Sequence, residues 1–539
     1  MRCPPGGTGL NRPWACWTLA ALLSCGTFLL FTNLGSYALW DDEAGTALHA
    51  TAVSKTGDTG AVVGENLVAF RSGVALQNLK DRTVSPLQYY LAAPFVALSE
   101  RSSFFARLPF ALSGFLALLL AVSWMWKSCQ NGSEVVIYSA VTLSCIPLFL
   151  YFRQCRYYSL VLLFVLLTLF LYLKKPKTGK LFLCLNLSLW GLMASHYLGY
   201  FSVVGALGID YLLWGRKDNP FSRQQLVCLG LLQIVFAALI MSIWNPLGTN
   251  WGAQLQDHGL SPTQRVVLFI WQLRDCFRSE FLVCILFLAS PLIAAKKRDV
   301  LLARAFVAVI LILLFTAAAS PQTFLGSTGT ADIRYVISIL PLGIFISGRV
   351  ILDLAGGRKL WLALGVFGFC FLNLLNPFRL DRGQGPSTFT GFFREILGPP
   401  NDPYRVASNW ISLHAPNRSS IWVLPDYACY PLMFHAPNGI YAWQLRPEQK
   451  QEEQFKNLPD IHFQGLVPPD FIVVFGPSVE QVRQLIGQWS MQGLRYQEVT
   501  RLMTFWKDLY RPELFWRTFK PIENFDPNTE AIYIFKRQP

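Results

Sequence analysis

Apolar stretches long enough to cross a bilayer recur along this chain, and they constrain its fold more than any other feature. A membrane-spanning α-helix needs about 20 consecutive, mainly apolar residues. The candidate segments are residues 14–34, 106–126, 134–150, 158–173, 181–195, 200–214, 225–244, 280–295, 300–319, 333–350 and 360–376. Charged residues make up 14% of the 539 residues, compared with about 25% in soluble proteins. The sequence therefore predicts a polytopic α-helical membrane protein with about eleven spans.

The basic residues of the short loops predict which side of the membrane each loop faces, because cytoplasmic loops carry an excess of Lys and Arg. Alternate loops hold such residues: Lys127, residues 174–180, Arg216, Lys217, Arg223, residues 296–298, Arg358 and Lys359. These loops share the cytoplasmic side only if residues 85–99 do not cross the membrane. We therefore expect that segment to be a helix in the interface, within a long outer loop of residues 37–105.

The same topology places four motifs on the outer face. They are WDDEA (40–44), YFRQCRYY (151–158), ASHYLGY (194–200) and GTADIRY (329–335). The polar tail follows on that side, so we expect a transmembrane module over residues 1–377 and an extracytoplasmic α/β domain over residues 378–539. Its expected strands are residues 419–425, 470–476 and 531–537, and its expected helices are residues 404–415 and 478–490.

Three adjacent acids, Asp41, Asp42 and Glu43, follow the first apolar segment. Acids in the first turn of a helix cap its N-terminus and complement its dipole, and the sequence that follows is compatible with a helix. A cap needs one acid, however, and three adjacent carboxylates repel one another. The cluster therefore also fits a catalytic acid or base, or a site for a divalent cation.

Two arginines, Arg153 and Arg156, lie between two spans on the predicted outer side. Arginines at span ends commonly extend along the helix to reach the membrane surface. Basic residues are under-represented on the outer side, however, and a guanidinium binds phosphate in a bidentate fashion. The pair is therefore either an anchor or a binding site for a lipid phosphate. Tyr157 is either an aromatic-belt residue or a contact to the substrate.

Two further outer motifs hold candidate substrate-binding residues. His196 and Tyr197 belong to ASHYLGY, and Arg334 and Tyr335 end GTADIRY. A histidine at the end of a span is either a satisfied structural residue or a general acid, base or metal ligand. For Arg334 the alternatives are an anchor at the membrane edge and a second phosphate clamp.

Composition excludes other classes of protein. The net charge of +14 resides largely in short loops, and no basic patch interleaved with aromatic residues indicates nucleic-acid binding. The twelve cysteines lie mostly within apolar segments and show no CxxC or Cys/His ligand spacing. They therefore indicate neither a disulfide framework nor a zinc site.

A set of motifs in a fixed order gives the chain a resemblance to a known family. WDDEAGTALHA, VSPLQYYLAAPF, ARLPFALSGFLALLL, LFLYFRQCRYYSLVLL, ASHYLGYF and RYVISILPL together resemble the GT-C membrane glycosyltransferases of the protein O-mannosyltransferase-like and lipid A aminoarabinose transferase-like group. The resemblance covers roughly residues 14–350. It implies a GT-C-like transmembrane module in a bacterial plasma (inner) membrane, with its active site on the extracytoplasmic side.

The resemblance also implies an activity. Members of this group transfer a sugar, with inversion, from a polyprenyl-phosphate carrier to a lipid, glycan or protein acceptor. The family's essential aspartate maps to Asp42, with Glu43 and Asp41 beside it. Its outer-loop arginines map to Arg153 and Arg156, and its outer histidine maps to His196.

One motif departs from the family pattern. Aminoarabinose transferases have an acid and a lysine before the proline of the PLxYY motif, where this chain has Val84 and Ser85 before Pro86. Asp81 and Arg82 lie nearby but out of register. A metal site of the family's kind and an aminoarabinose substrate are therefore both in doubt.

Alternative functions remain open at this point. A secondary transporter would place ionisable groups near mid-membrane. The chief charges within the predicted spans are Asp210 and Arg304. A lipid-linked oligosaccharide ligase or polymerase would use the same outer-face site with a different donor. A non-catalytic membrane scaffold would need none of the outer acids.

Overall fold

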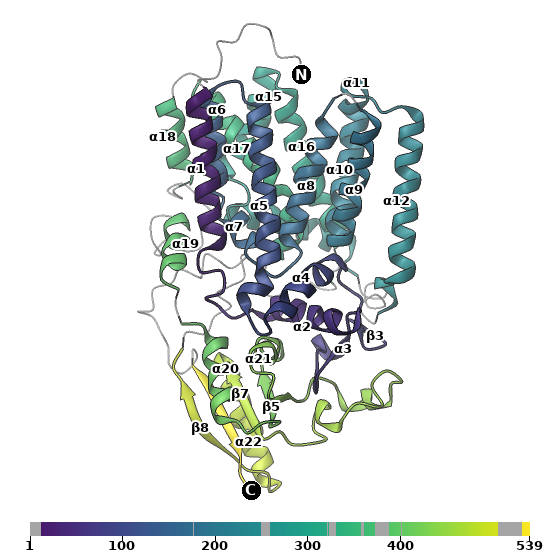
Figure 1. Ribbon diagram of the computed structural model, residues 1–539, viewed down its shortest axis with the longest axis vertical. Helices are drawn as coiled ribbons and strands as arrows, with labels where there is room; N and C mark the ends of the chain where they lie inside the picture. The colour runs from purple at the N-terminus through teal and green to yellow at the C-terminus, as the bar shows by residue number, and fades with distance from the viewer. Residues whose placement is uncertain are drawn as a thin grey trace.

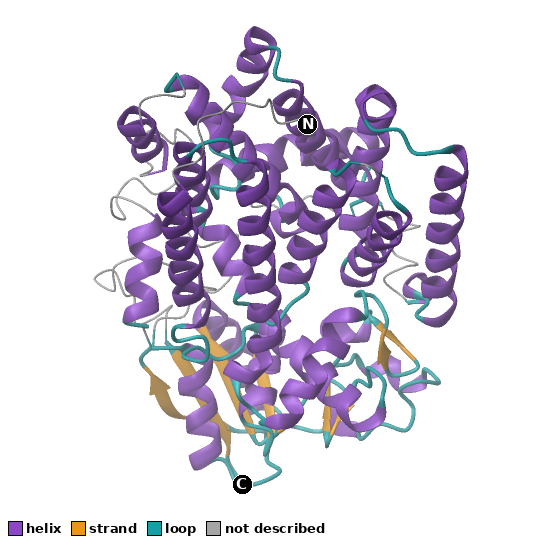
Figure 2. Cartoon of the chain, turned by 45° about the horizontal axis from the view of Figure 1, so that its top comes forward, coloured by secondary structure: helices purple, strands orange, loops and turns teal. Residues whose placement is uncertain are grey.

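A computed structural model describes residues 12–175, 177–249, 259–320, 322, 330–356, 360–371, 388–399, 401–504 and 531–539. Most of the helices stand side by side in one bundle, and a small domain containing a sheet lies at one end of it (Figure 1). Figure 2 shows the same division, with the strands gathered at the end of the molecule that holds the C-terminus.

Apolar sequence accounts for the bundle, since each predicted segment overlaps one or two helices in the described part of the chain. The helices are α1 (Arg12–Phe31), α5 (Ser103–Ser128), α6 (Gly132–Ser144), α7 (Ile146–Phe152), α8 (Tyr158–Leu173), α9 (Gly179–Ser195), α10 (Tyr197–Asp210), α11 (Arg216–Asp218), α12 (Arg223–Ile243), α14 (Pro262–Arg278), α15 (Cys284–Lys297), α16 (Val300–Ala318), α17 (Leu340–Leu354) and α18 (Leu360–Phe371). A 3₁₀ helix, η3 (Ile333–Ile339), precedes α17.

The number of helices that are long and apolar enough to cross a membrane is lower than the eleven predicted segments. Within the described residues six helices qualify, or seven if α6 and α7, which meet at a bend of 59°, form one span. Three further apolar helices, α4 (Leu87–Leu98), α8 and α9, are only 10–17 residues long. Pro147 in the first turn of α7 lies at the break between α6 and α7, so the segment predicted at residues 134–150 is not one continuous helix.

The outer loop forms a layer across one end of the bundle. Its helices are α2 (Asp41–Thr56), α3 (Phe70–Gly73) and α4, and its two hairpins pair β1 (Val62–Val63) with β2 (Asn66–Leu67) and β3 (Leu76–Gln77) with β4 (Lys80–Asp81). Figure 1 shows α2 and α4 lying across the ends of the bundle helices. The structure therefore agrees with the prediction that residues 85–99 do not continue the bundle as another upright helix.

The C-terminal part contains the predicted α/β fold. Its helices are α19 (Thr388–Leu397), α20 (Pro403–His414), α21 (Cys429–His435) and α22 (Val479–Met491). Its strands are β5 (Ser420–Leu424), β6 (Ile440–Tyr441), β7 (Phe471–Phe475), β8 (Tyr496–Leu502) and β9 (Ile532–Arg537), in the order β6-β5-β7-β9-β8. The strands β6, β5 and β7 run parallel to one another. Strand β9 runs antiparallel to both of its neighbours, β7 and β8.

The outer loop and the C-terminal domain share one hydrophobic core. Ala38 and Leu39, just before α2, are fully buried in a cluster that also contains Tyr404, Leu432 and Phe475 from the C-terminal domain. The predicted domain boundary at residues 377 and 378 lies outside the described residues. Because burial is shared, the layer that contains the three acids is held between the bundle and the C-terminal domain.

Candidate active site

The three adjacent acids at the start of α2 have three different surroundings. The peptide N–H of Trp40 donates to Glu43 Oε2 at 3.3 Å, and that of Asp42 donates to Asp41 Oδ1 at 2.7 Å. Both bonds satisfy N–H groups that the first turn of a helix leaves without partners. The side chain of Asp42 is 22% exposed, whereas that of Glu43 is fully buried. The capping interpretation thus applies to part of the cluster and leaves Asp42 for another role.

Glu43 is enclosed by a buried ion pair. Arg107 on α5 donates to both of its carboxylate oxygens, from Nε at 2.8 Å and from Nη2 at 2.6 Å. The peptide N–H of Cys155 donates a further hydrogen bond to Glu43 at 2.7 Å. A carboxylate with all its acceptor sites used in this way is poorly placed to take up a proton. The structure therefore separates Glu43 from Asp42 and gives it a fixed structural environment.

Asp42 instead meets two arginines from distant parts of the chain. Arg156 Nη2 lies 3.4 Å from Asp42 Oδ2, and Arg334 Nη1 donates a short hydrogen bond to the same oxygen. Arg156 also donates to Thr46 Oγ1 at 3.2 Å, one turn along α2 from Asp42. These two predicted arginines converge on the predicted aspartate, as the outer-face topology requires.

Arg156 retains an unused donor beside Asp42, whereas Arg334 is held in place by two acids. The buried Nε of Arg156 has no hydrogen-bond partner in the described part of the chain. Arg334 is held on its other side by Asp332, whose Oδ2 accepts from Nε at 2.8 Å. Asp275 on α14 accepts from the peptide N–H of Ala331 at 2.8 Å and so fixes the start of this segment. The result is a group of donors that is positioned by protein contacts but not saturated by them.

Three aromatic rings form a stack beside these charges. His196 lies parallel to Tyr157, with ring centroids 4.5 Å apart and an interplanar angle of 11°. On its other side it lies parallel to Tyr335, with centroids 6.0 Å apart. Arg156 lies 5.3 Å from the ring centroid of Tyr157, and Arg334 lies 5.8 Å from that of Tyr335. One cluster thus contains Asp42 and five of the seven predicted substrate-binding residues: Arg156, Tyr157, His196, Arg334 and Tyr335.

His196 has a defined tautomer in this stack. Its Nδ1 accepts from the peptide N–H of Gly199 at 3.0 Å, so the proton of the neutral ring resides on Nε2. Burial, together with the nearby charges of Arg156 and Arg334, lowers the pKa of His196 to about 3. The imidazole is therefore neutral at physiological pH and is a hydrogen-bond donor through Nε2.

Two predicted residues lie elsewhere. Arg153 uses Nη1 to donate to the carbonyl oxygens of Leu29 at 2.8 Å, Leu30 at 3.0 Å and Thr32 at 2.9 Å, so it caps the end of α1. Tyr197 packs in an apolar cluster with Tyr89 and Trp244. The structure does not bring Arg153 to Asp42, and the physical reason is that helix α1 presents unpaired carbonyl oxygens closer at hand.

Asp81 and Arg82, which lie out of register with the family motif, both have partners within the protein. Asp81 accepts from Tyr89 Oη at 2.6 Å and lies 3.7 Å from His49 Nε2. Arg82 donates to Asp58 at 2.9 Å and stacks over Trp244 at 4.2 Å. Across the described residues, no group of three or more His, Cys, Asp or Glu side chains is arranged to hold a metal ion.

Several residues of the site were not predicted. Arg107 belongs to an apolar segment and has no local signal that it pairs with Glu43. Thr46 and Asp332 could have been found, because one lies four residues after Asp42 and the other lies two residues before Arg334. Asp275 has no signal in the sequence, since its contact depends on how α14 packs.

Comparisons with known proteins identify the fold. No family model matches the chain, and no curated protein matches its sequence. The described architecture is similar to that of two solved ArnT structures, which confirms the predicted fold of a polytopic α-helical bundle with a C-terminal α/β domain. The crystal structure of ArnT from Cupriavidus metallidurans bound to undecaprenyl phosphate is similar with a TM-score of 0.54 and 11% identity, over 97% of this chain and 98% of that chain. The apo state of ArnT gives 0.53 and 12% over the same shares.

The structure of another protein is similar at a lower score. The archaeal oligosaccharyltransferase AglB from Archaeoglobus fulgidus, in complex with an inhibitory peptide and a dolichol-phosphate, gives a TM-score of 0.48 and 11% identity. The similarity covers 86% of this chain and 70% of that chain. At identities this low, similarity extends to the fold and not to the substrate.

Proposed function

We propose that this protein is an inverting glycosyltransferase that moves a sugar from a polyprenyl-phosphate carrier to an acceptor on the outer face of the membrane. The observation that carries the proposal is the convergence of Asp42, Arg156 and Arg334 from three separate segments at one end of the bundle. Similarity of fold to an ArnT structure that contains undecaprenyl phosphate supports this class of donor.

The reaction follows from the charges at the site. Asp42 accepts the proton of an acceptor hydroxyl, and the resulting oxygen nucleophile attacks the anomeric carbon of the sugar. The bond between that carbon and the phosphate oxygen breaks, and its electron pair leaves with the polyprenyl phosphate. Arg156 and Arg334 stabilise the negative charge that develops on the leaving group. Attack from the side opposite the phosphate inverts the anomeric configuration.

The aromatic stack supplies the sugar-binding surface in this proposal. The neutral imidazole of His196 donates from Nε2 to a sugar hydroxyl or a phosphate oxygen. Tyr157 and Tyr335 hold the imidazole flat between them and place their rings beside the two arginines. Asp41, Glu43 and Arg153 act as structural residues that fix the positions of neighbouring backbone segments.

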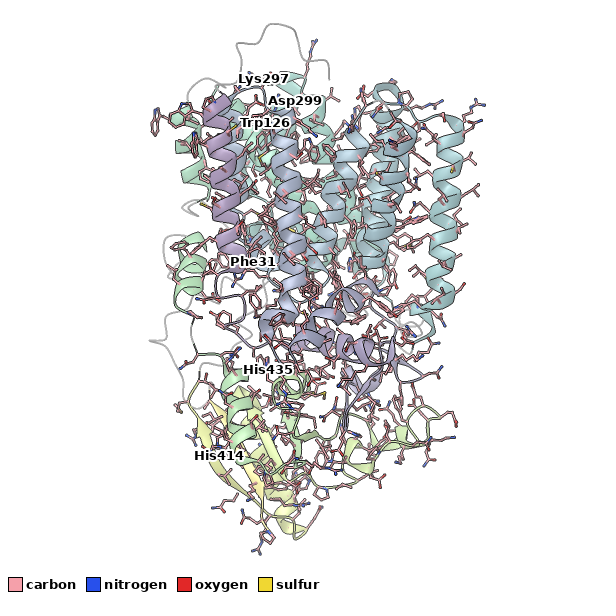
Figure 3. All side chains as sticks on the ribbon, in the orientation of Figure 1. Phe31, Trp126, Lys297, Asp299, His414 and His435 are labelled. Carbon is pink, nitrogen blue, oxygen red and sulfur yellow. The ribbon has the colours of Figure 1, made fainter. Side chains whose placement is uncertain are left out.

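The basic loops support an orientation for the protein in the membrane. Figure 3 shows Lys297 at the end of the bundle remote from the C-terminal domain, whereas Phe31 lies at the end nearer to it. The positive-inside rule assigns the end with Lys297 to the cytoplasm. The site and the C-terminal domain then face the extracytoplasmic side of a bacterial plasma (inner) membrane, where lipid-linked sugars would be used.

The decisive experiment replaces the proposed base. Asp42→Asn keeps the shape of the side chain and removes its ability to accept a proton, so transfer should fall by about 10²–10⁴-fold. The measurement is release of labelled sugar from a purified polyprenyl-phosphate sugar fraction, with thermal unfolding as the check on folding. Transfer by Asp42→Asn at the rate of the unmodified protein would exclude Asp42 as the base.

The donor itself separates this proposal from a lipid-linked oligosaccharide ligase or polymerase. Mass spectrometry of carrier lipids that accumulate in a deletion strain should show monosaccharides on a monophosphate carrier. Accumulation of oligosaccharides on a diphosphate carrier would favour the ligase. The same strain reveals the acceptor through the surface glycan, lipid or protein that lacks the sugar.

A further inference from the structure

The segment that leads into α2 is held from two sides. From the bundle side, Arg107 on α5 donates to the carbonyl oxygens of Leu34 at 3.1 Å, Tyr37 at 3.0 Å and Ala38 at 2.9 Å. The same guanidinium binds Glu43, so one side chain connects the segment to the first turn of α2. These contacts account for the carbonyl groups of the segment but not for its N–H groups.

The C-terminal domain supplies the remaining partners. The carboxylate of Asp402 accepts a short hydrogen bond from the peptide N–H of Ala38, and Arg405 donates to the carbonyl oxygen of Gly35 at 2.9 Å. The imidazole of His435, at the end of α21, accepts from the peptide N–H of Leu39 at 3.2 Å. Leu39 is only three residues from Asp42, and both Ala38 and Leu39 are fully buried.

His435 connects more than one element. Its Nε2 also lies 3.4 Å from Ser103 Oγ, at the start of the helix that carries Arg107. The ring also interacts with the backbone of Arg101, just before α5. Because Nε2 accepts from Leu39, the imidazole must be neutral, with its proton on Nδ1. Figure 3 shows His435 at the junction between the C-terminal domain and the rest of the molecule.

We propose that the C-terminal domain positions the catalytic base, and that His435 is the positioning residue through which it does so. A buried N–H without a partner is destabilising, so the segment adopts the conformation that keeps Leu39 bonded to His435. That conformation sets where α2 begins and therefore where the Asp42 carboxylate lies relative to Arg156 and Arg334. The inference rests on the proposed function, in which Asp42 is the base.

A pair of substitutions at His435 tests this inference in the full-length protein in lipid nanodiscs. His435→Phe keeps an aromatic ring but removes the acceptor, whereas His435→Gln keeps an acceptor for the Leu39 N–H. The matched control is His414→Phe, because His414 is an exposed histidine of the same domain that stacks on Trp410 at 4.9 Å. Figure 3 shows His414 far from the junction.

The first measurement is hydrogen exchange, which needs no substrate. In His435→Phe the amides of residues 37–46 should exchange at least tenfold faster, while those of β5 and β7 stay protected. His435→Gln and His414→Phe should behave like the unmodified protein. Unchanged exchange of residues 37–46 in His435→Phe would overturn the inference, whatever Asp42 does. If β5 and β7 also lose protection in His435→Phe, the result is compared with that of His435→Gln. Equally fast exchange of residues 37–46 in the two variants would overturn the inference.

The second measurement is turnover of labelled sugar on undecaprenyl phosphate, extracted from the expressing membranes. We expect kcat to fall about tenfold in His435→Phe with the donor KM within twofold, because the arginines stay in place while the base is displaced. His435→Gln should restore kcat. A rise in KM with unchanged kcat would contradict a positioning role. If Asp42→Asn proves fully active, the proposed function fails, yet the exchange measurement still decides whether His435 holds the segment.

Discussion

At one end of the bundle Asp42 shares a single carboxylate oxygen between two arginines, whereas at the other end Asp210 gives both oxygens to one arginine. Arg304 donates to Asp210 from Nε at 2.8 Å and from Nη2 at 2.6 Å, and Tyr172 donates to the same carboxylate at 2.7 Å. Arg304 also reaches Asp218 at 3.1 Å. Both clusters contain the same residue types, so composition does not distinguish them.

The difference lies in what each cluster leaves unused. Around Asp210 the carboxylate and guanidinium satisfy one another, which is how buried ion pairs connect helices. Around Asp42 the Nε of Arg156 and one oxygen of Asp332 lack partners among the described residues. Buried groups that remain unsatisfied call for an explanation, and a bound phosphate and sugar would supply it. The Asp210–Arg304 pair also contains the chief charges within the predicted spans, and it lies at the end of α10 rather than at mid-span, where a transporter would place its ionisable groups.

The largest expected effect is the loss of stability when the buried ion pair of Arg107 and Glu43 is broken. Arg107→Gln leaves the buried carboxyl of Glu43 without its partner, and breaking such a pair costs about 3–5 kcal/mol. We expect a large loss of thermal stability in detergent and poor yield. Arg156→Gln, measured beside it, should lose much less stability because Arg334 still neutralises Asp42. Equal losses in the two variants would remove the distinction between saturated and open clusters.

The next effect contrasts the two ends directly. Asp210→Asn weakens the pair with Arg304 and should cost about 3 kcal/mol of stability, while transfer per folded molecule stays within about twofold because the site lies at the far end of α10. Asp42→Asn should show the opposite pattern. Thermal unfolding and transfer assays on both variants give the comparison, and strongly impaired catalysis by folded Asp210→Asn would contradict it.

The smallest expected effect concerns Glu395, a buried acid outside the Asp42 cluster. It tests whether a buried acid must take part in the reaction or can simply reduce the stability of the fold. Burial raises the pKa of Glu395 on α19 to about 7 from its ordinary 4.5, against the opposing effects of Tyr37 and Arg153. The unfolded chain therefore ionises this carboxyl at lower pH than the folded chain, so the residue destabilises the fold increasingly as pH rises from 4.5 to about 7.

Glu395→Gln removes that penalty. It should raise stability at pH 8 by about 2 kcal/mol, since one pKa unit corresponds to about 1.4 kcal/mol and partial exposure reduces the total. Near pH 4.5 the variant and the unmodified protein should unfold at similar temperatures. Transfer should be unchanged. A variant that loses transfer would show that this acid, although remote from Asp42, belongs to the reaction.

Much of the architecture followed from the sequence because its signals are local. Apolar length predicted the helices of the bundle, and the basic loops predicted that residues 85–99 do not join it. Three strands and two helices of the C-terminal domain were predicted within a residue or two. Strands β6 and β8 were missed, because β6 has two residues and β8 alternates between half-buried and exposed residues without a clear apolar face.

The sequence by itself determined that acids, arginines and a histidine share one side of a membrane protein. Only the tertiary structure decided which of them meet. Asp42 and Glu43 are adjacent in the chain, yet one faces Arg156 and Arg334 while the other is enclosed by Arg107, because successive helical residues point about 100° apart. Arg153 and Arg156 are three residues apart, yet one caps α1 and the other reaches Asp42. Side-chain direction and long-range packing make these choices, and neither is encoded in local pattern.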